Sequence, residues 1–280
     1  PRPSCSSFRA NLASESSELV INVHQVDAFT DRAFHGNPAG VCVLTGPAPE
    51  GWMQRVAAEL NLSETAFLFQ ECASYKIRYF TPQVEVPLCG HATLASAHVL
   101  WSVGLVSENM PIKFQAENVL LFAEKAGEWI RMDFPADPSV PIQAPPGLLS
   151  SLDVEPVSVY RTASNRYLIE VGSWEAVRDL RPDRFSIATL DIHGVIVTAH
   201  SAKPGIDFVS RYFAPSVGID EDPVTGTAHC ALGMFWSQRL GKKRLVGEQL
   251  SARGGTVMVR VMRDRIQISG QAVTVLIGEF

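Results

Sequence analysis

Two glycine turns carry residues whose types and spacing could do chemistry. Gly90–Thr93 (GHAT) and Gly226–Ala228 (GTA) each lead into an apolar stretch that predicts a helix. A helix N-terminus offers unpaired backbone N–H groups and the positive end of the helix dipole, so both turns favour a carboxylate or a phosphate. A pair of such turns suits a small carboxylated substrate or the enolate formed from it. The simpler alternative is that each glycine only makes a tight turn into a helix.

Three further side chains could transfer or stabilise a proton. Glu64 lies in the run Asn61–Phe67, where apolar neighbours should desolvate its carboxyl group, raise its pKa and favour a general acid/base role. Asp222 lies just before the second glycine turn, and His91 could cap the helix, bind a ligand or donate a proton. A surface glutamate, a solvated acidic loop and a structural histidine are the corresponding alternatives.

Both turns belong to an internal repeat. Arg78–Val84 (RYFTPQV) matches Arg211–Val217 (RYFAPSV), and each run leads through a short loop to Pro-x-x-Gly and then to an apolar helix. The same order of strand, proline, glycine and helix in both copies predicts a duplication. Two similar halves that face each other would bring both helix N-termini to one cleft.

Short β-like runs rich in Val, Ile, Tyr and Phe dominate the chain, and three helices are predicted among them. His91–Trp101 and Thr227–Leu240 are apolar on nearly all sides, which predicts central, buried helices. In Trp52–Leu60 the apolar residues fall on one face. The expected strands are Val20–Val26, Val41–Leu44, Ala66–Phe69, Lys76–Phe80, Val119–Phe122, Trp129–Met132, Tyr167–Val171, Val195–Ala199, Thr256–Val261 and Val273–Ile277.

Composition excludes several classes of protein. Of the 280 residues, 46% are hydrophobic and 19% are charged, which is too apolar for a disordered chain. The formal charge of −5 provides no basic field for nucleic acid, and no apolar run approaches the roughly 20 residues that span a bilayer. The five cysteines and seven histidines lack the spacing of a disulfide framework or a metal site. We therefore predict no metal, no nucleic acid, no membrane and a cytoplasmic location.

Four ordered motifs resemble the PhzF family, the phenazine-biosynthesis-type isomerases that are related to diaminopimelate epimerase. The resemblance covers nearly everything from residue 22 to the end. It implies an α+β diaminopimelate epimerase-like fold with two pseudo-symmetric halves, each a curled sheet around a central helix, and an active site between them. The motifs are VDAFTDRAFHGNPAGV (26–41), NLSETAF (61–67), RYFTPQVEVPLCGHATLASA (78–97) and SRYFAPSVGIDEDPVTGTA (210–228).

The resemblance also implies roles for single residues. Glu64 would be the catalytic acid/base, and His91 and Asp222 would position and polarise the substrate. The family needs no metal or organic cofactor, and the resemblance implies a homodimer that acts on a small carboxylic acid. Hydrogen bonds around the substrate carboxylate would come from Ser63, Gly90, Gly226 and Thr227.

The resemblance implies domain boundaries as well. Residues 1–20 are expected to form a flexible leader. Residues 21–133 together with 270–280 would form the N-terminal half, because the C-terminal strand of such proteins returns to it, and 134–269 would form the C-terminal half. Ser164 lies in a loop outside every motif, so Ser164→Ala is expected to weaken carboxylate binding less than Gly226→Val.

The preferred hypothesis is a cofactor-independent isomerase that moves a proton within a small carboxylic acid, with Glu64 taking and returning it. A two-base racemase or epimerase of an amino acid is the second hypothesis. A non-catalytic small-molecule-binding or regulatory protein on the same scaffold is the third. The related epimerases carry one cysteine in each half, whereas here Cys89 precedes Gly90 but Thr225 precedes Gly226. Because an alcohol is a far weaker acid than a thiol, the two-thiol pair is incomplete and Cys89 is predicted to be a packing residue.

Overall fold

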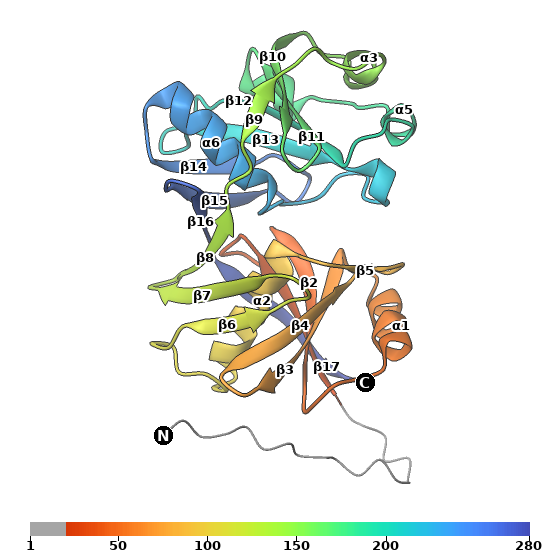
Figure 1. Cartoon of the computed structure of the whole chain (residues 1–280), viewed down its shortest axis with the longest axis vertical. Helices are drawn as coiled ribbons and strands as arrows, with labels where there is room; N and C mark the ends of the chain where they lie inside the picture. The colour runs from red at the N-terminus through yellow and green to blue at the C-terminus, as the bar shows by residue number, and fades with distance from the viewer. Residues whose placement is uncertain (1–20) are drawn as a thin grey trace.

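The computed structural model describes residues 21–280, so the expected leader (1–20) lies outside the described residues. Two halves stand one above the other, each with a sheet curled around one central helix (Figure 1). Their strands form one 17-stranded sheet. The halves are joined where β8 (Trp129–Pro135) pairs antiparallel with β16 (Arg265–Gly270). The fold is therefore α+β, as predicted.

The first half surrounds helix α2 (Gly90–Ser102). Nearly all residues of α2 are buried because the helix is apolar on every side. Helix α1 (Glu50–Leu60) packs on the outer face of the sheet, where it buries Met53 against Phe67 and Phe80. The strands are β1 (Asn22–Ala28), β2 (Asn37–Leu44), β3 (Glu64–Glu71), β4 (Ser74–Phe80), β5 (Glu85–Val86), β6 (Ile112–Gln115), β7 (Leu120–Ala126) and β8.

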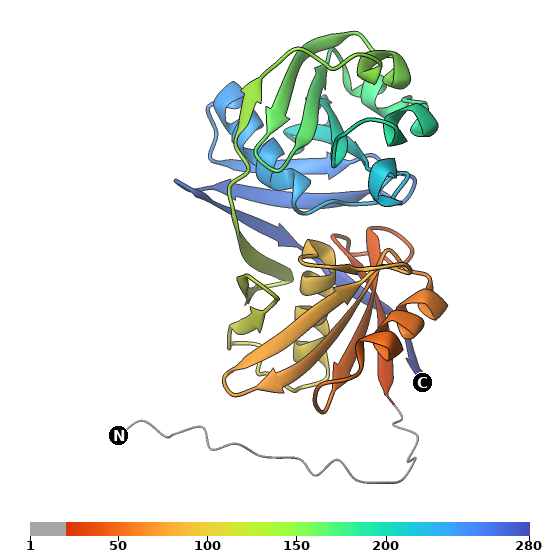
Figure 2. The same ribbon diagram turned by 45° about the vertical axis from the view of Figure 1, so that its right-hand side comes forward.

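The second half repeats this order around helix α6 (Ala228–Leu240). The last strand, β17 (Ala272–Glu279), returns to the first half and pairs with β1 (Figure 2). The remaining strands are β9 (Ser139–Pro141), β10 (Pro156–Thr162), β11 (Arg166–Val171), β12 (Gly194–His200), β13 (Phe208–Phe213), β14 (Arg244–Gln249), β15 (Gly255–Val261) and β16. The short helices are α3 (Leu148–Leu152), α4 (Trp174–Arg178), α5 (Arg184–Ala188) and the 3-10 turn η1 (Pro215–Val217).

The predicted helices and strands each coincide with an observed element, shifted at most by a few terminal residues. Several short strands and the helices α3 to α5 were not predicted. The five-residue helices α3 to α5 and the shortest strands, β5 and β9, are too short to show a clear periodicity, whereas β10, β14 and β16 are as long as strands that were predicted. The domain boundaries drawn from the sequence stay a prediction.

Strand register relates the two halves residue by residue. Phe80 and Phe213 end the two copies of the Arg-Tyr-Phe repeat. Phe80 pairs with the second residue of β3, and Phe213 pairs with the second residue of β12. The first residues of these strands, Glu64 and Gly194, therefore occupy equivalent positions.

The same relation extends to the neighbouring strands. Ala39 of β2 lies opposite Glu64 in a parallel pair. Arg166 of β11 lies opposite Gly194 in the equivalent parallel pair. Arg166 therefore stands in the second half where the first half has Ala39.

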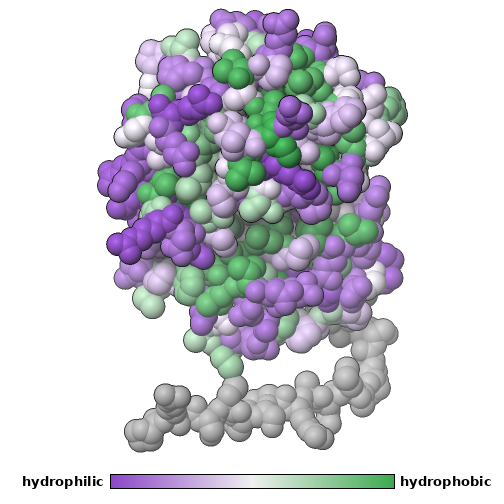
Figure 3. Space-filling model, turned by 45° about the horizontal axis from the view of Figure 1, so that its top comes forward, coloured by the Kyte–Doolittle hydropathy of each residue, from purple (hydrophilic) through white to green (hydrophobic). Residues whose placement is uncertain are grey.

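The surface is mixed in polarity. Hydrophilic side chains cover most of the face shown in Figure 3, with smaller hydrophobic areas between them. Among the helices of residues 21–280, none is both long enough and apolar enough to cross a membrane.

Candidate active site

The two glycine turns meet at the boundary of the halves. A Cβ built on Gly90 would lie 3.9 Å from the Cα of Gly226, and a Cβ on Gly226 would lie 4.0 Å from the Cα of Gly90. Gly90 is the first residue of α2, and Gly226 precedes Thr227, the N-cap of α6. The N-termini of both central helices therefore converge on one place, where their dipoles favour negative charge.

Glu64 and His91 face each other beside this junction. Glu64 begins β3, and its Oε2 lies 3.3 Å from Nε2 of His91, in the first turn of α2. The two residues are only 8% and 5% exposed. Burial, together with the nearby Asp222 carboxylate, raises the pKa of Glu64 to about 8. Burial lowers the pKa of His91 to about 3, so near neutral pH a mostly protonated carboxyl group faces a neutral imidazole.

Hydrogen bonds fix the orientation of the His91 ring. The two hydrogens of the Asn37 side-chain amide are directed to Asp222 Oδ1 (2.7 Å) and to the carbonyl of Val224 (3.0 Å). His91 itself donates to the carbonyl of Pro38. Because Nε2 has no hydrogen-bond partner within residues 21–280, we assign this donor to Nδ1. In the neutral ring Nε2 then carries a lone pair that faces the glutamate.

Asp222 is held by residues of both halves. Its Oδ1 accepts from Asn37, and its Oδ2 accepts from the Thr225 hydroxyl at 2.5 Å. Gln249 accepts from the Thr225 backbone N–H (2.9 Å) and donates to the Asp222 carbonyl (2.7 Å), which fixes the loop. Burial raises the pKa of Asp222 to about 6 against the opposing effect of its hydrogen bonds. Near neutral pH Asp222 is mostly ionised, and its charge disfavours ionisation of Glu64.

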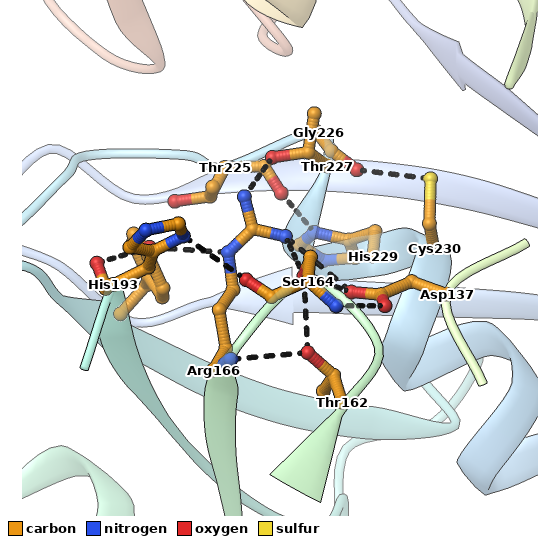
Figure 4. A network of polar contacts seen from close by, with 11 residues as sticks. Asp137, Thr162, Ser164, Arg166, His193, Thr225, Gly226, Thr227, His229 and Cys230 are labelled. Carbon is orange, nitrogen blue, oxygen red and sulfur yellow. Dashed lines mark hydrogen bonds and ion pairs between the residues drawn. The ribbon is translucent and has the colours of Figure 1, made fainter. Parts of the chain in front are cut away.

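Thr227 belongs to a network centred on Arg166 (Figure 4). Arg166 Nη2 donates to the Thr227 hydroxyl at 3.1 Å, and Nε donates to the Tyr212 hydroxyl at 3.2 Å. Its Nη1 donates to Ser164 Oγ at 2.9 Å and lies 3.4 Å from an Asp137 carboxylate oxygen. A guanidinium group therefore lies beside the N-terminus of α6.

The structure brings most of the predicted site residues together. Their proposed roles stay predictions. Glu64, His91 and Asp222 gather where Gly90 and Gly226 meet, and Thr227 adjoins this junction. Ser63 lies directly before β3 and is partly exposed.

Asn37 and Arg166, which contact Asp222 and Thr227, were not predicted from the sequence. Asn37 lies inside the first motif, and its Gly-Asn-Pro context could have singled it out. Arg166 had no local signal, because only the strand pairing places it beside Thr227. Ser164 is a poor control position, because its hydroxyl donates to Asp137 at 2.5 Å and accepts from Arg166, which contacts Thr227.

Cys89, the residue before α2, brings a third potential metal ligand to this place. One donor atom each of Glu64, Cys89 and His91 lie within 4.8 Å of one another, and all three residues are buried. The Cys89 thiol lies 3.4 Å from Nδ1 of His91. Burial and the Glu64 charge raise the pKa of the thiol, so Cys89 is neutral at ordinary pH.

Comparison with known proteins identifies the family. The profile of the phenazine biosynthesis-like proteins (PhzC-PhzF) matches residues 26–278. The chain belongs to this family. A relative from Halalkalibacterium halodurans, named an uncharacterized isomerase, is 46% identical over 262 residues, which cover 93% of this chain and 98% of the relative. These matches support an isomerase.

Solved structures support the fold of this PhzF-like chain. A PhzF family protein from Enterococcus faecalis superposes with a TM-score of 0.89 at 38% identity, covering 94% of this chain and 99% of that protein. A predicted epimerase from Pseudomonas aeruginosa superposes with a TM-score of 0.72 at 19% identity, covering 93% and 99%. At that identity the second likeness shows the fold alone. The fold is the expected diaminopimelate epimerase-like fold.

Proposed function

We propose that this chain is a cofactor-independent isomerase that moves a proton within a small carboxylic acid, with Glu64 as the acid/base. The observation that carries the proposal is the buried Glu64 carboxyl group, 3.3 Å from the His91 imidazole at the N-terminus of α2. Its pKa of about 8 lies close to neutral pH. A group with such a pKa can both take and return a proton, as a general acid/base must.

The substrate carboxylate would bind where the two central helices meet. Gly90 and Gly226 have no side chains there, so backbone N–H groups can approach an anion. Arg166 adds a positive charge beside Thr227. Removing a proton from the carbon next to the carboxylate shifts electron density onto its oxygens, and the same donors would stabilise that enolate.

A single carboxyl group would perform both proton transfers. The ionised Glu64 takes the proton, the C–H bond breaks, and its electron pair forms the enolate. In a substrate that carries a β,γ double bond, protonated Glu64 then returns the proton to the γ carbon, and the double bond moves to the α,β position. Neutral His91 would keep the carboxyl group in place, and the Asp222 charge would keep its pKa high. Both transfers would then occur on one face of the substrate.

Substrate entry would require the halves to separate. Glu64, His91 and Asp222 are each less than 10% exposed. The halves are joined through the pairing of β8 with β16 and through side-chain contacts such as Arg253 with Asp27, and opening would have to break the latter. Closure would then remove water from the reacting groups.

Solvent-deuterium exchange tests this proposal. The protein is incubated in D₂O with a panel of small carboxylic acids, and deuterium incorporation is measured by mass spectrometry. We expect Glu64→Gln to lower exchange by at least about 10²–10⁴-fold, the usual contribution of a general acid/base. Glu59→Gln, a matched change at an exposed position of α1, should leave it unaltered. Near-normal exchange in Glu64→Gln would refute the assignment.

A two-base racemase remains the second candidate, because Cys89 directly precedes Gly90. Against it, the second half presents Thr225 and Gly194 at the positions equivalent to Cys89 and Glu64. The stereochemistry of the exchanged product separates the two, since inversion at one carbon needs a base on each face. The homodimer and the cytoplasmic location stay predictions.

A further inference from the structure

Cys89 is a buried group that the proposed acid/base chemistry does not use. It lies next to the two side chains that do the chemistry, and it is not exposed to solvent. Carboxylate, thiolate and imidazole are three of the donor types that bind zinc in proteins. Magnesium and calcium prefer sets of oxygen ligands, so a sulfur and a nitrogen ligand select against them.

Two of the donor atoms in this cluster have no hydrogen bond. Glu64 Oε2 and His91 Nε2 are buried, and neither has a hydrogen-bond partner of adequate geometry within residues 21–280. The two atoms face each other at 3.3 Å without a well-formed hydrogen bond, and a divalent cation that displaces the proton of the Glu64 carboxyl group would satisfy both at once. The same two atoms are free to accept a cation because the Nδ1 atom of His91 already holds the ring in place.

The separations also suit a cation. With bonds of about 2.0–2.3 Å, donor atoms around a tetrahedral zinc ion stand roughly 3.3–3.6 Å apart. The distance of 3.3 Å between Glu64 Oε2 and His91 Nε2 already has this value. Each of the three residues has a donor atom within 4.8 Å of the other two, and a side-chain rotation of Cys89 would bring its sulfur to bonding distance of a shared cation.

We propose that Glu64, Cys89 and His91 form a binding site for a thiophilic divalent cation of the Zn²⁺ type. Water would occupy the remaining coordination position. The cation would engage the carboxyl group and imidazole that the proposed isomerase needs, so bound zinc would inhibit the enzyme. The inhibition rests on the proposed function, whereas the binding does not.

Direct binding measurements test the site without any substrate. Chelator-treated protein is titrated with Zn²⁺ in competition with a chromophoric chelator, and with Co²⁺ as a spectroscopic probe. We expect one tight site per chain and a thiolate-to-cobalt charge-transfer band. Cys89→Ser should abolish the band and weaken zinc binding by at least about 100-fold, no less than the loss of an outer-shell partner costs. His91→Gln should weaken binding similarly.

Matched controls separate this site from other thiols. Cys42→Ser, a change at another buried cysteine, and Cys72→Ser, at an exposed one, should retain both the band and the affinity. Absence of tight binding in the wild type, or a band that persists in Cys89→Ser, would overturn the proposal. Thermal melting identifies a variant that fails to fold, in which case Cys89→Ala replaces it.

A separate measurement tests the inhibition. Zinc should suppress deuterium exchange by the wild type at the concentrations that saturate the site. Tight binding without suppression would overturn the inhibitory role. If no acid in the panel exchanges at all, the proposed function fails while the metal titration still decides the site.

Discussion

The two halves of the molecule share one scaffold but differ at equivalent positions of it. Glu64 in the first half corresponds to Gly194 in the second, where any Cβ would collide with the Tyr212 hydroxyl. Arg166 in the second half corresponds to Ala39 in the first. The first half therefore presents a carboxyl group at the junction, and the second presents a guanidinium group.

The sequence at the two glycine turns shows the same division. Cys89 and His91 flank Gly90, whereas threonines stand at both equivalent positions around Gly226. Beside the junction the first half carries Glu64, Cys89 and His91, whereas the second carries threonines and Arg166 together with the Asp222 carboxylate. In the proposed function, the duplication would supply two helix N-termini for one anion, while the first half alone would transfer the proton.

After Glu64→Gln, the largest effect on exchange is expected from adding a side chain at the glycine turn of the second half. In Gly226→Val the new Cβ would lie 3.1 Å from the Phe29 ring, and its methyl groups would block the approach of an anion. We expect exchange to fall by at least about 100-fold, comparable to losing an oxyanion donor. Gly172→Val is the control, because that glycine is exposed and a Cβ added there would meet no atom within 4 Å beyond its chain neighbours. Equal activity in the two variants would contradict an anion site at Gly226.

The second effect concerns the guanidinium group of Arg166 in the second half. Arg166→Met removes charged donors to the Thr227 region, and we expect KM for the exchanging acid to rise by about 10–100-fold, with a smaller change in kcat. Arg161→Met is the matched control, since Arg161 is exposed and bonds to Asn165 instead. A uniform loss of kcat with unchanged KM would assign Arg166 a purely structural role.

The third prediction concerns the carboxyl group of the first half and stability. The pKa of Glu64 is raised from 4.5 to about 8, so its contribution to stability is complete below pH 4.5 and is lost as pH rises towards 8. The unfolding free energy should decline over this window by up to about 1.4 kcal/mol per pH unit from this group. Denaturant titrations at a series of pH values measure this decline, and Glu64→Gln should flatten it. If the variant shows the same pH dependence as the wild type, Glu64 is hydrated.

Two histidines produce the opposite trend at lower pH. Burial lowers the pKa of His91 to about 3 and of His229 to about 4. Below pH 6.5 the histidines of the unfolded chain are protonated, whereas these two buried rings stay neutral. The free energy of unfolding should therefore increase as pH rises towards 6.5. The Glu64→Gln comparison is therefore most informative between pH 6.5 and 8.

The smallest effect on deuterium exchange is expected from a change at Cys89. Cys89 has no counterpart at Thr225, so Cys89→Ala should alter exchange by less than about threefold, as for a small packing residue. Alkylation by a thiol reagent followed by activity measurement provides the check. Inversion of the substrate together with inactivation on alkylating Cys89 would instead identify two-base chemistry.

Local sequence patterns were sufficient to predict the central helices, many of the strands and the internal repeat. The apolar helices α2 and α6 and the strands around them follow from periodicity and β-branched content, because those patterns reflect burial directly. The repeated Arg-Tyr-Phe run predicted the duplication. The apolar neighbours of Glu64 predicted a raised pKa, and burial raises it to about 8.

Tertiary structure decided which residues from distant parts of the chain meet. Asn37 reaches Asp222 across 185 positions, and Arg166 reaches Thr227 across 61. Neither pairing has a local signature, because strand register and the joining of the halves set both. The equivalence of Glu64 with Gly194 likewise exists only in the paired strands. Hydrophobic patterning specifies which faces are buried, whereas the polar contacts of the site depend on how those buried elements are placed against each other.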